Sequence, residues 1–258
     1  GVRNYYLYSS LNSEKWYFIS WDNDSSFSRT YYRMRNYVEG QSWEQGMTQF
    51  LHISLFNRIF REKEYRDMLS QAVEDLRENY LSEEQVGAMT RQYAQTVKPY
   101  VYRQPDQSFV SLDESEYDTL IAALPGEVEE NYGYYQLSLE KPWPFFVETP
   151  VLDEGKLTVQ WDAAYDLDGE AITYDFMLAS DYNFTEILYQ EEGLILPEVS
   201  FDMLPPGQYY IRVQARNESG YVQDCFDYYS VDDIGKVYGT KVFLVNEDGT
   251  VSNYVETE

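Results

Sequence analysis

Hydrophobic and polar residues recur with different periods along the chain, beginning with two aromatic runs near the start. NYYLY (residues 4–8) and KWYFIS (15–20) are separated by the turn-rich segment SSLNSE. Short runs rich in aromatic residues with turn residues between them favour β-strands. We therefore predict a β-hairpin at the start of the chain.

Four later segments have the three-to-four-residue spacing of amphipathic helices. Apolar residues with this spacing occupy the first two segments: Met47, Phe50, Leu51, Leu55, Ile59 and Phe60, then Tyr65, Met68, Leu69, Ala72 and Leu76. The third helix is predicted to begin at LSEEQ, where Ser82 and Gln85 form a capping box. A fourth, shorter helix is predicted after Asp113, with Glu116 in the matching position.

The pattern changes to alternation after the linker-like segment KPWPFF (141–146). Period-two runs occur in KLTVQWD (156–162), AITYDFMLAS (171–180) and QYYIRVQARN (208–217). Such strands with turns between them predict an antiparallel β-sandwich. The predicted fold class is therefore an α+β multidomain protein, with a hairpin and helices in residues 1–144 and a sandwich in residues 145–258.

Composition and charge narrow the possible partners. The 258 residues include 19 Lys and Arg against 45 Asp and Glu, a formal net charge of −26. This charge disfavours nucleic acid and anionic membranes as partners. No run approaches the roughly 20 apolar residues of a membrane span, so we expect no membrane span in this chain.

The common catalytic motifs are absent from the sequence: there is no GxxxxGK[ST], GxGxxG, GxSxG or HExxH. One cysteine, Cys225, and one histidine, His52, rule out a multi-cysteine or multi-histidine metal site. We expect Cys225 to be a buried small hydrophobe and His52 a packed residue on an apolar helix. The alternating acids Asp166, Asp168 and Glu170 favour a solvated turn over a calcium loop.

Two acids follow the second aromatic strand in KWYFISWDNDSSF (15–27). Asp22 and Asp24 are compatible with a simple turn, because Asp and Asn form local bonds to backbone. They are also compatible with a magnesium site at the end of a strand. In a protein kinase a catalytic-loop Asn precedes one strand, and a second strand leads to the metal-binding Asp. Asn4 precedes the first strand here.

The segments NYYLY, KWYFISWDND, FLHISLFNRIFREKEYRDMLSQAVEDL and YLSEEQVGAMTRQYAQTVKPYV together resemble the later half of the spore coat protein H (CotH) kinase family. The resemblance covers residues 3–103, with a weaker continuation to 140. It implies an atypical bacterial kinase, extracellular or on the cell surface, that uses Mg2+ and ATP to phosphorylate a protein substrate. It also implies roles for three residues: Asp22 as the magnesium-binding aspartate, Asn4 as the second metal ligand and Asp24 as a supporting acid.

This chain departs from the family pattern at several positions. The glycine after the metal-binding Asp has no counterpart, and the catalytic-base Asp, the nucleotide-binding Lys and its Glu partner would all precede Asn4. We therefore expect no catalytic residue within the chain, which would be the C-terminal portion of a larger kinase, truncated and inactive when isolated. We expect no tightly bound ATP or Mg2+, and the nucleotide-binding residues stay unknown. The alternative is a non-catalytic cell-surface structural or interaction module.

A second resemblance lies in residues 146–246. LPPGQYYIRVQARNESG is similar to the corner and penultimate strand of a fibronectin type III domain, and Trp161 stands at the place of its core tryptophan. One residue is missing before Tyr209 relative to the family pattern. DLDGEAITYDF is typical of such modules in bacterial cell-surface proteins, which implies a spacer or a docking module for a cell-surface partner.

Overall fold

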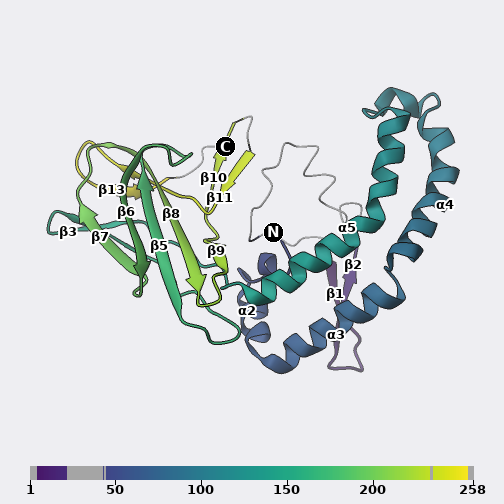
Figure 1. Cartoon of the computed structure of the whole chain (residues 1–258), viewed down its shortest axis with the longest axis horizontal. Coiled ribbons are helices and arrows are strands. Elements are labelled where there is room, and N and C mark those ends of the chain that lie inside the picture. Colours follow the sequence, from purple (N-terminus) through teal and green to yellow (C-terminus); the bar gives the residue numbers. More distant parts are fainter. Residues whose placement is uncertain (1–4, 22–42, 44, 233–234, 255–258) are drawn as a thin grey trace. The chain divides into compact units, whose positions relative to one another are not determined.

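The computed structural model describes residues 5–21, 43, 45–232 and 235–254 (Figure 1). The chain divides into two compact units. The first, here called the helical unit, comprises Gly1–Arg35 and Asp67–Glu130. The second, here called the β unit, comprises Asn36–Arg66 and Asn131–Glu258. Each unit thus draws on two separate stretches of the sequence.

The helical unit opens with the predicted β-hairpin. Strands β1 (Tyr5–Ser9) and β2 (Trp16–Ser20) pair antiparallel in a register that joins Tyr5 to Ser20 and Ser9 to Trp16. The unit continues with the helices α3 (Lys63–Asn79), α4 (Glu83–Val101), η3 (Asp106–Phe109) and α5 (Glu114–Glu140), of which α3 and α5 extend into the β unit.

Both predicted helix starts are confirmed. At α4 the Ser82 hydroxyl accepts the Gln85 N–H, and the Gln85 side chain accepts the Ser82 N–H, each at 3.4 Å. At α5 the Asp113 carboxylate accepts the Glu116 N–H at 2.9 Å, and Glu116 accepts the Asp113 N–H at 2.8 Å. These reciprocal bonds satisfy N–H groups that a helix start leaves unpaired.

The expected length of the fourth helix is wrong, because α5 runs for 27 residues and passes through Pro125. An internal proline removes one helical hydrogen bond and costs about 3 kcal/mol. Contacts farther along stabilise the helix: the Ser138 hydroxyl accepts the Met47 N–H at 3.2 Å, and the Glu140 carbonyl accepts from the Asn217 amide at 3.0 Å. Packing in the β unit therefore extends the helix beyond its expected end.

The helix expected over residues 47–60 is interrupted. The structure has a short 3-10 helix, η2 (Thr48–Phe50), and then α2 (Ser54–Arg61), separated by an extended Ile53. The Asn57 amide donates to the Leu51 carbonyl at 3.2 Å and satisfies an acceptor at the break. His52 lies in this break, so its expected place on a helix is wrong. Its ring meets that of Phe226 edge-on at 6.1 Å, but the residue is exposed.

The described residues of the β unit form two larger antiparallel sheets and a two-stranded one. The first has the order β13-β12-β8-β5-β6, with β9 beside β8, and the second has the order β3-β4-β7. The strands β10 and β11 form the third. Their bounds are β3 Val151–Asp153, β4 Lys156–Gln160, β5 Ile172–Ala179, β6 Ile187–Leu194, β7 Glu198–Asp202, β8 Gly207–Asn217, β9 Val222–Asp224, β10 Tyr228–Val231, β11 Gly235–Tyr238, β12 Lys241–Val245 and β13 Val251–Asn253.

Side chains from the two larger sheets share one hydrophobic core. Val159 on β4, Phe176 on β5 and Ile211 on β8 are all fully buried in it. The ring of Trp161 stacks on that of Phe176 at 6.1 Å between centroids. Burial of one such large side chain stabilises a fold by about 1.5–3 kcal/mol. Cys225 lies in the same core, as expected.

Residues before α3 are part of the β unit through specific contacts. Trp43 meets the rings of Phe226 and Tyr238 edge-on at 5.7 and 5.1 Å. The Arg61 guanidinium lies over the Tyr165 ring at 4.8 Å. Gly46 approaches α5 so closely that a Cβ would lie 2.5 Å from a backbone oxygen. The segment around η2 and α2 is therefore packed against strands far away in the sequence.

Candidate functional site

The hairpin is where the sequence predicts a metal site. Because Tyr5 pairs with Ser20, the start of β1 and the end of β2 lie at the same edge of the hairpin. Trp21, directly after β2, stacks on Tyr6 with ring centroids 5.7 Å apart. The pairing thus places Tyr5, which follows Asn4 in the sequence, opposite Ser20, which precedes Asp22 by two residues.

The predicted ligands themselves, Asn4, Asp22 and Asp24, lie outside the described residues. Their assignment stays a prediction. Within the described ranges, no group of three or more His, Cys, Asp or Glu side chains is arranged to hold a metal ion. The donor set of two carboxylates and one amide consists of hard oxygen ligands, which are those that Mg2+ prefers.

Both faces of the hairpin are apolar and open. Large side chains that are about half exposed or more occur on both strands: Tyr6, Leu7, Tyr8, Trp16, Tyr17, Phe18 and Ile19. A strand that reads as apolar on both faces is typical of a sheet covered on both sides. A two-stranded hairpin alone is marginally stable in water.

The acids at 166–170 form a turn, as expected, but Asp166 is buried, so the expectation that this turn is solvated is wrong at that residue. One Asp166 carboxylate oxygen accepts the N–H groups of Asp168 at 2.9 Å and Glu170 at 3.2 Å. The Glu170 carboxylate accepts the Ser219 N–H at 2.9 Å. Asp166 therefore stabilises its own turn through local hydrogen bonds, and Glu170 joins this turn to a second loop of the β unit.

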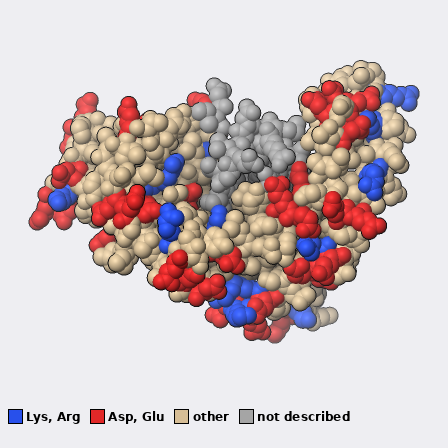
Figure 2. Space-filling model, in the orientation of Figure 1, with Lys and Arg blue, Asp and Glu red and all other residues tan. Residues whose placement is uncertain are grey.

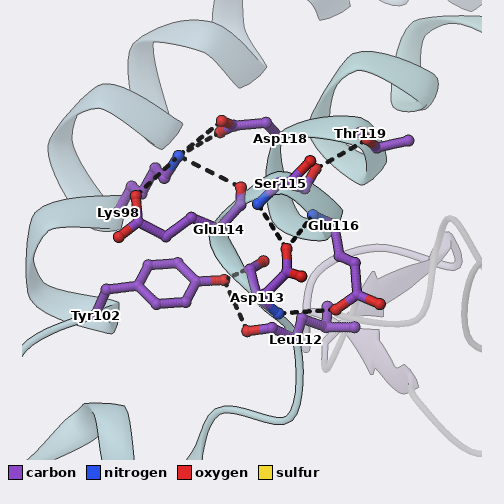
Figure 3. Close-up of polar contacts among 9 residues, drawn as sticks. All are labelled: Lys98, Tyr102, Leu112, Asp113, Glu114, Ser115, Glu116, Asp118 and Thr119. Atoms are coloured by element: carbon purple, nitrogen blue, oxygen red, sulfur yellow. Dashed lines mark hydrogen bonds and ion pairs between the residues drawn. The ribbon is translucent and has the colours of Figure 1, made fainter.

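A polar cluster joins the end of α4 to the start of α5 (Figure 3). The Lys98 ammonium lies 2.7 Å from both carboxylate oxygens of Asp118 and 3.6 Å from the Glu114 carboxylate. The Tyr102 hydroxyl donates toward the carbonyls of Leu112 and Asp113 at 3.1 and 2.8 Å. These contacts close the loop between the two helices at its base.

The cluster also shifts the acidity of two of its members. The hydrogen bond to Asp118 is the main cause that raises the pKa of Lys98 above its ordinary value, and the attraction of Glu114 adds to it. Removal from solvent is the main cause that raises the pKa of the Tyr102 phenol. Lys98 is therefore a firmly charged ion-pair partner near neutral pH, and Tyr102 is a neutral hydrogen-bond donor there.

A cleft of about 790 Å3, here called the α4–α5 cleft, begins beside this cluster. Its walls come from α4 and from the first half of α5, and the residues that define it are Gly87, Arg91, Gln95, Lys98, Asp118 and Pro125. All of them belong to the helical unit.

Acidic side chains are spread widely over the surface in view, and basic ones are fewer (Figure 2).

Sequence reasoning missed both the cluster and the cleft. The available signal was the position of Lys98 near the end of one helix and of Asp118 in the second turn of the next, after the Asp113 cap. Consecutive antiparallel helices bring such ends together.

Among the described residues, no helix is long and apolar enough to cross a membrane.

Comparison with known protein families identifies the class of protein to which this chain belongs. The family model described as "CotH kinase protein" matches residues 1–135, more than half of the 258 residues. The match makes this chain a kinase-like protein. The chain belongs to the CotH kinase protein family.

Other comparisons add little. No curated protein matches the chain. Among solved structures, the twitchin kinase region from C. elegans is similar with 16% sequence identity and a TM-score of 0.25. That match covers 43% of this chain and 20% of the twitchin structure, so the chain spans about a fifth of that protein's length. A likeness of this size carries no argument about fold or function.

Proposed function

We propose that this chain is the C-terminal portion of a CotH-family protein kinase and that its hairpin carries the metal ligands for Mg-ATP phosphoryl transfer. The observation that carries the proposal is the Tyr5–Ser20 pairing. Asn4 is the residue before Tyr5, and Asp22 is two residues after Ser20. The family match over residues 1–135 supports the same assignment.

In this proposal the chain's own residues hold and orient the metal. Asp22 supplies the carboxylate that binds the ion, Asn4 supplies an amide oxygen, and Asp24 supports the site with a second negative charge. When bound, Mg2+ neutralises the charge that develops on the transferring phosphoryl group. Phosphoryl transfer depends on positioning shared among several groups. The chain alone, without the family's catalytic base and nucleotide-binding Lys, is therefore proposed to be inactive.

For the β unit we propose a fibronectin type III-like β-sandwich that serves as a spacer or a docking module. The Tyr209 hydroxyl donates to the Pro205 carbonyl at 2.8 Å, as in the tyrosine corner of such sandwiches. The buried Trp161 and the core shared by the two larger sheets give further support. This module and the family resemblance also underlie our proposal that the protein acts outside a bacterial cell, on a secreted or surface protein.

The test uses the protein encoded by the complete gene. Purified Asp22→Ala and Asp24→Ala variants are compared with the parent for magnesium-dependent phosphate incorporation into protein and for thermal melting. We expect Asp22→Ala to abolish transfer with an unchanged melting temperature, because it removes the group that holds the ion. Asp24→Ala should cause a smaller loss.

Two outcomes would contradict the proposal. Near-normal transfer by Asp22→Ala, or a loss that follows only from unfolding, would return the acids to the role of a turn. If the parent transfers no phosphate and its upstream sequence lacks a catalytic base and a Lys, the alternative of a non-catalytic surface module is favoured.

A further inference from the structure

The α4–α5 cleft is long enough to hold a short extended peptide. On α4 its lining residues recur every three or four positions from Gly87 to Lys98, so they form one stripe along the helix. Eleven steps of helix rise span about 16 Å. An extended peptide rises about 3.3 Å per residue, so about five residues fit along this length.

The acids of the cleft are already paired, which leaves a cation to define its charge. Asp118 and Glu114 are both within ion-pair distance of Lys98. In the part of the chain that the structure describes, the guanidinium of Arg91 has no carboxylate partner and the Gln95 amide has no hydrogen bond. The available donors of the cleft are therefore those of Arg91 and Gln95, one turn apart on α4.

Gly87 makes room for the Arg91 side chain. A Cβ at this buried position would lie 3.1 Å from an Arg91 guanidinium nitrogen and 3.5 Å from Pro125 on the opposite wall. Glycine inside a helix costs about 1 kcal/mol relative to alanine. Glycine at this position leaves space for the end of the Arg91 side chain beside the helix. Arg91 is exposed and lines the cleft, and among the described residues it has no ion pair.

The walls also offer hydrogen-bond acceptors. Pro99 lies inside α4 and Pro125 inside α5, and both line the cleft. Because proline has no N–H, the carbonyls of Gln95 and Ile121 lack the donor that the residue four positions later supplies in a helix. A surface with both donors and acceptors suits a peptide backbone, which presents both.

We propose that the α4–α5 cleft binds an extended protein segment of about five residues, with one carboxylate side chain paired with Arg91 and apolar neighbours against Ile121 and Pro125. Guanidinium and carboxylate form bidentate, charge-assisted hydrogen bonds. The net charge of −26 repels strongly acidic chains, so the segment carries its single acid within a neutral or basic sequence. This interaction is additional to the proposed kinase function and involves neither nucleotide nor metal.

The experiment uses fluorescein-labelled peptide pools of about seven residues. The central residue is Glu, Gln or Lys, and the flanking positions are mixtures of Ala, Leu, Pro and Lys. Each pool is titrated with the 258-residue chain in buffer without nucleotide or divalent metal, and binding is followed by fluorescence polarisation. We expect the Glu pool to bind about tenfold more tightly than the Gln pool, and the Lys pool more weakly still.

Variants locate the binding. Arg91→Gln should make the Glu and Gln pools bind equally, and Gly87→Ala should reduce the difference because the new methyl group displaces the guanidinium. Arg103→Gln is the matched control, because Arg103 is an exposed arginine of the same unit that does not line the cleft. It should keep the full difference. Circular dichroism melting verifies that each variant is folded.

Several results would overturn the inference. These are no binding of any pool, equal binding of the Glu and Gln pools, tightest binding of the Lys pool, or an unchanged preference in a folded Arg91→Gln variant. Each is independent of phosphoryl transfer, because the assay contains no ATP. Failure here therefore leaves the proposed kinase function untouched, and failure of the kinase test leaves this binding site untouched.

Discussion

Replacement of Gly46 by alanine should destabilise the β unit strongly. Gly46 has a φ of +62°, a left-handed conformation that costs an L-residue roughly 1–2 kcal/mol. Its new Cβ would also lie 2.5 Å from the Tyr134 carbonyl oxygen and 2.6 Å from the Ser138 hydroxyl oxygen. The first of these is backbone of α5, which cannot rotate away. Overpacking of this kind costs about 1–3 kcal/mol.

Together the two terms predict a loss of about 3 kcal/mol in the free energy of unfolding for Gly46→Ala. The control is Gly155→Ala, since Gly155 has a φ of +82° but no atom within 4 Å of its Cβ position. That variant should lose only the conformational part, about 1 kcal/mol.

Urea unfolding of both variants, followed by circular dichroism and tryptophan fluorescence, measures these losses. The two probes show whether the units unfold together. If the two variants differed by less than about 0.5 kcal/mol, the close approach of the Gly46 segment to α5 would be refuted.

Three further predictions concern single side chains. Tyr209→Phe should lower the free energy of unfolding by about 1 kcal/mol, because the partly buried hydrogen bond to the Pro205 carbonyl is lost. Equal urea midpoints for variant and parent would contradict the tyrosine corner. Burial raises the pKa of the Cys225 thiol well above its ordinary value. A thiol reagent should therefore leave the native chain unmodified at pH 8 and modify one thiol per chain in denaturant. Rapid modification of the native chain would show that Cys225 is accessible. The pKa of Lys98 is raised in the folded protein, so its bond to Asp118 stabilises the fold fully below the unfolded pKa of 10.5 and is lost as the pH rises through the folded pKa. The melting temperatures of the parent and Lys98→Met should therefore converge in strong alkali. A constant difference between them would contradict this linkage.

The predicted metal site depends on residues beyond the described ranges. The prediction of Asn4, Asp22 and Asp24 came from a motif and its family resemblance, and it stays a prediction. The structure contributes the pairing of Tyr5 with Ser20, which sequence alone implied only through the hairpin pattern. Local strand and turn signals predict which ends of β1 and β2 lie opposite each other, so this part of the site could be predicted from the sequence.

The sequence by itself determined the elements whose causes are local. The hairpin, the strands around Trp161 and Ile211, and the helix starts at Ser82 and Asp113 all follow from alternation or from bonds between residues three apart. Such interactions form within a few residues. Their signal is therefore present in any short stretch of the chain.

Only the tertiary structure decided the features that join distant residues. The extension of α5 past Pro125 and the closeness of Gly46 to α5 depend on partners about 80 or more residues away. The α4–α5 cleft likewise arises because two helices lie side by side, with the acids of one neutralised by Lys98 of the other. Local propensities are worth a few tenths to about 1 kcal/mol per residue. Burial and hydrogen bonding between distant segments outweigh them, and no short window of the sequence contains both partners.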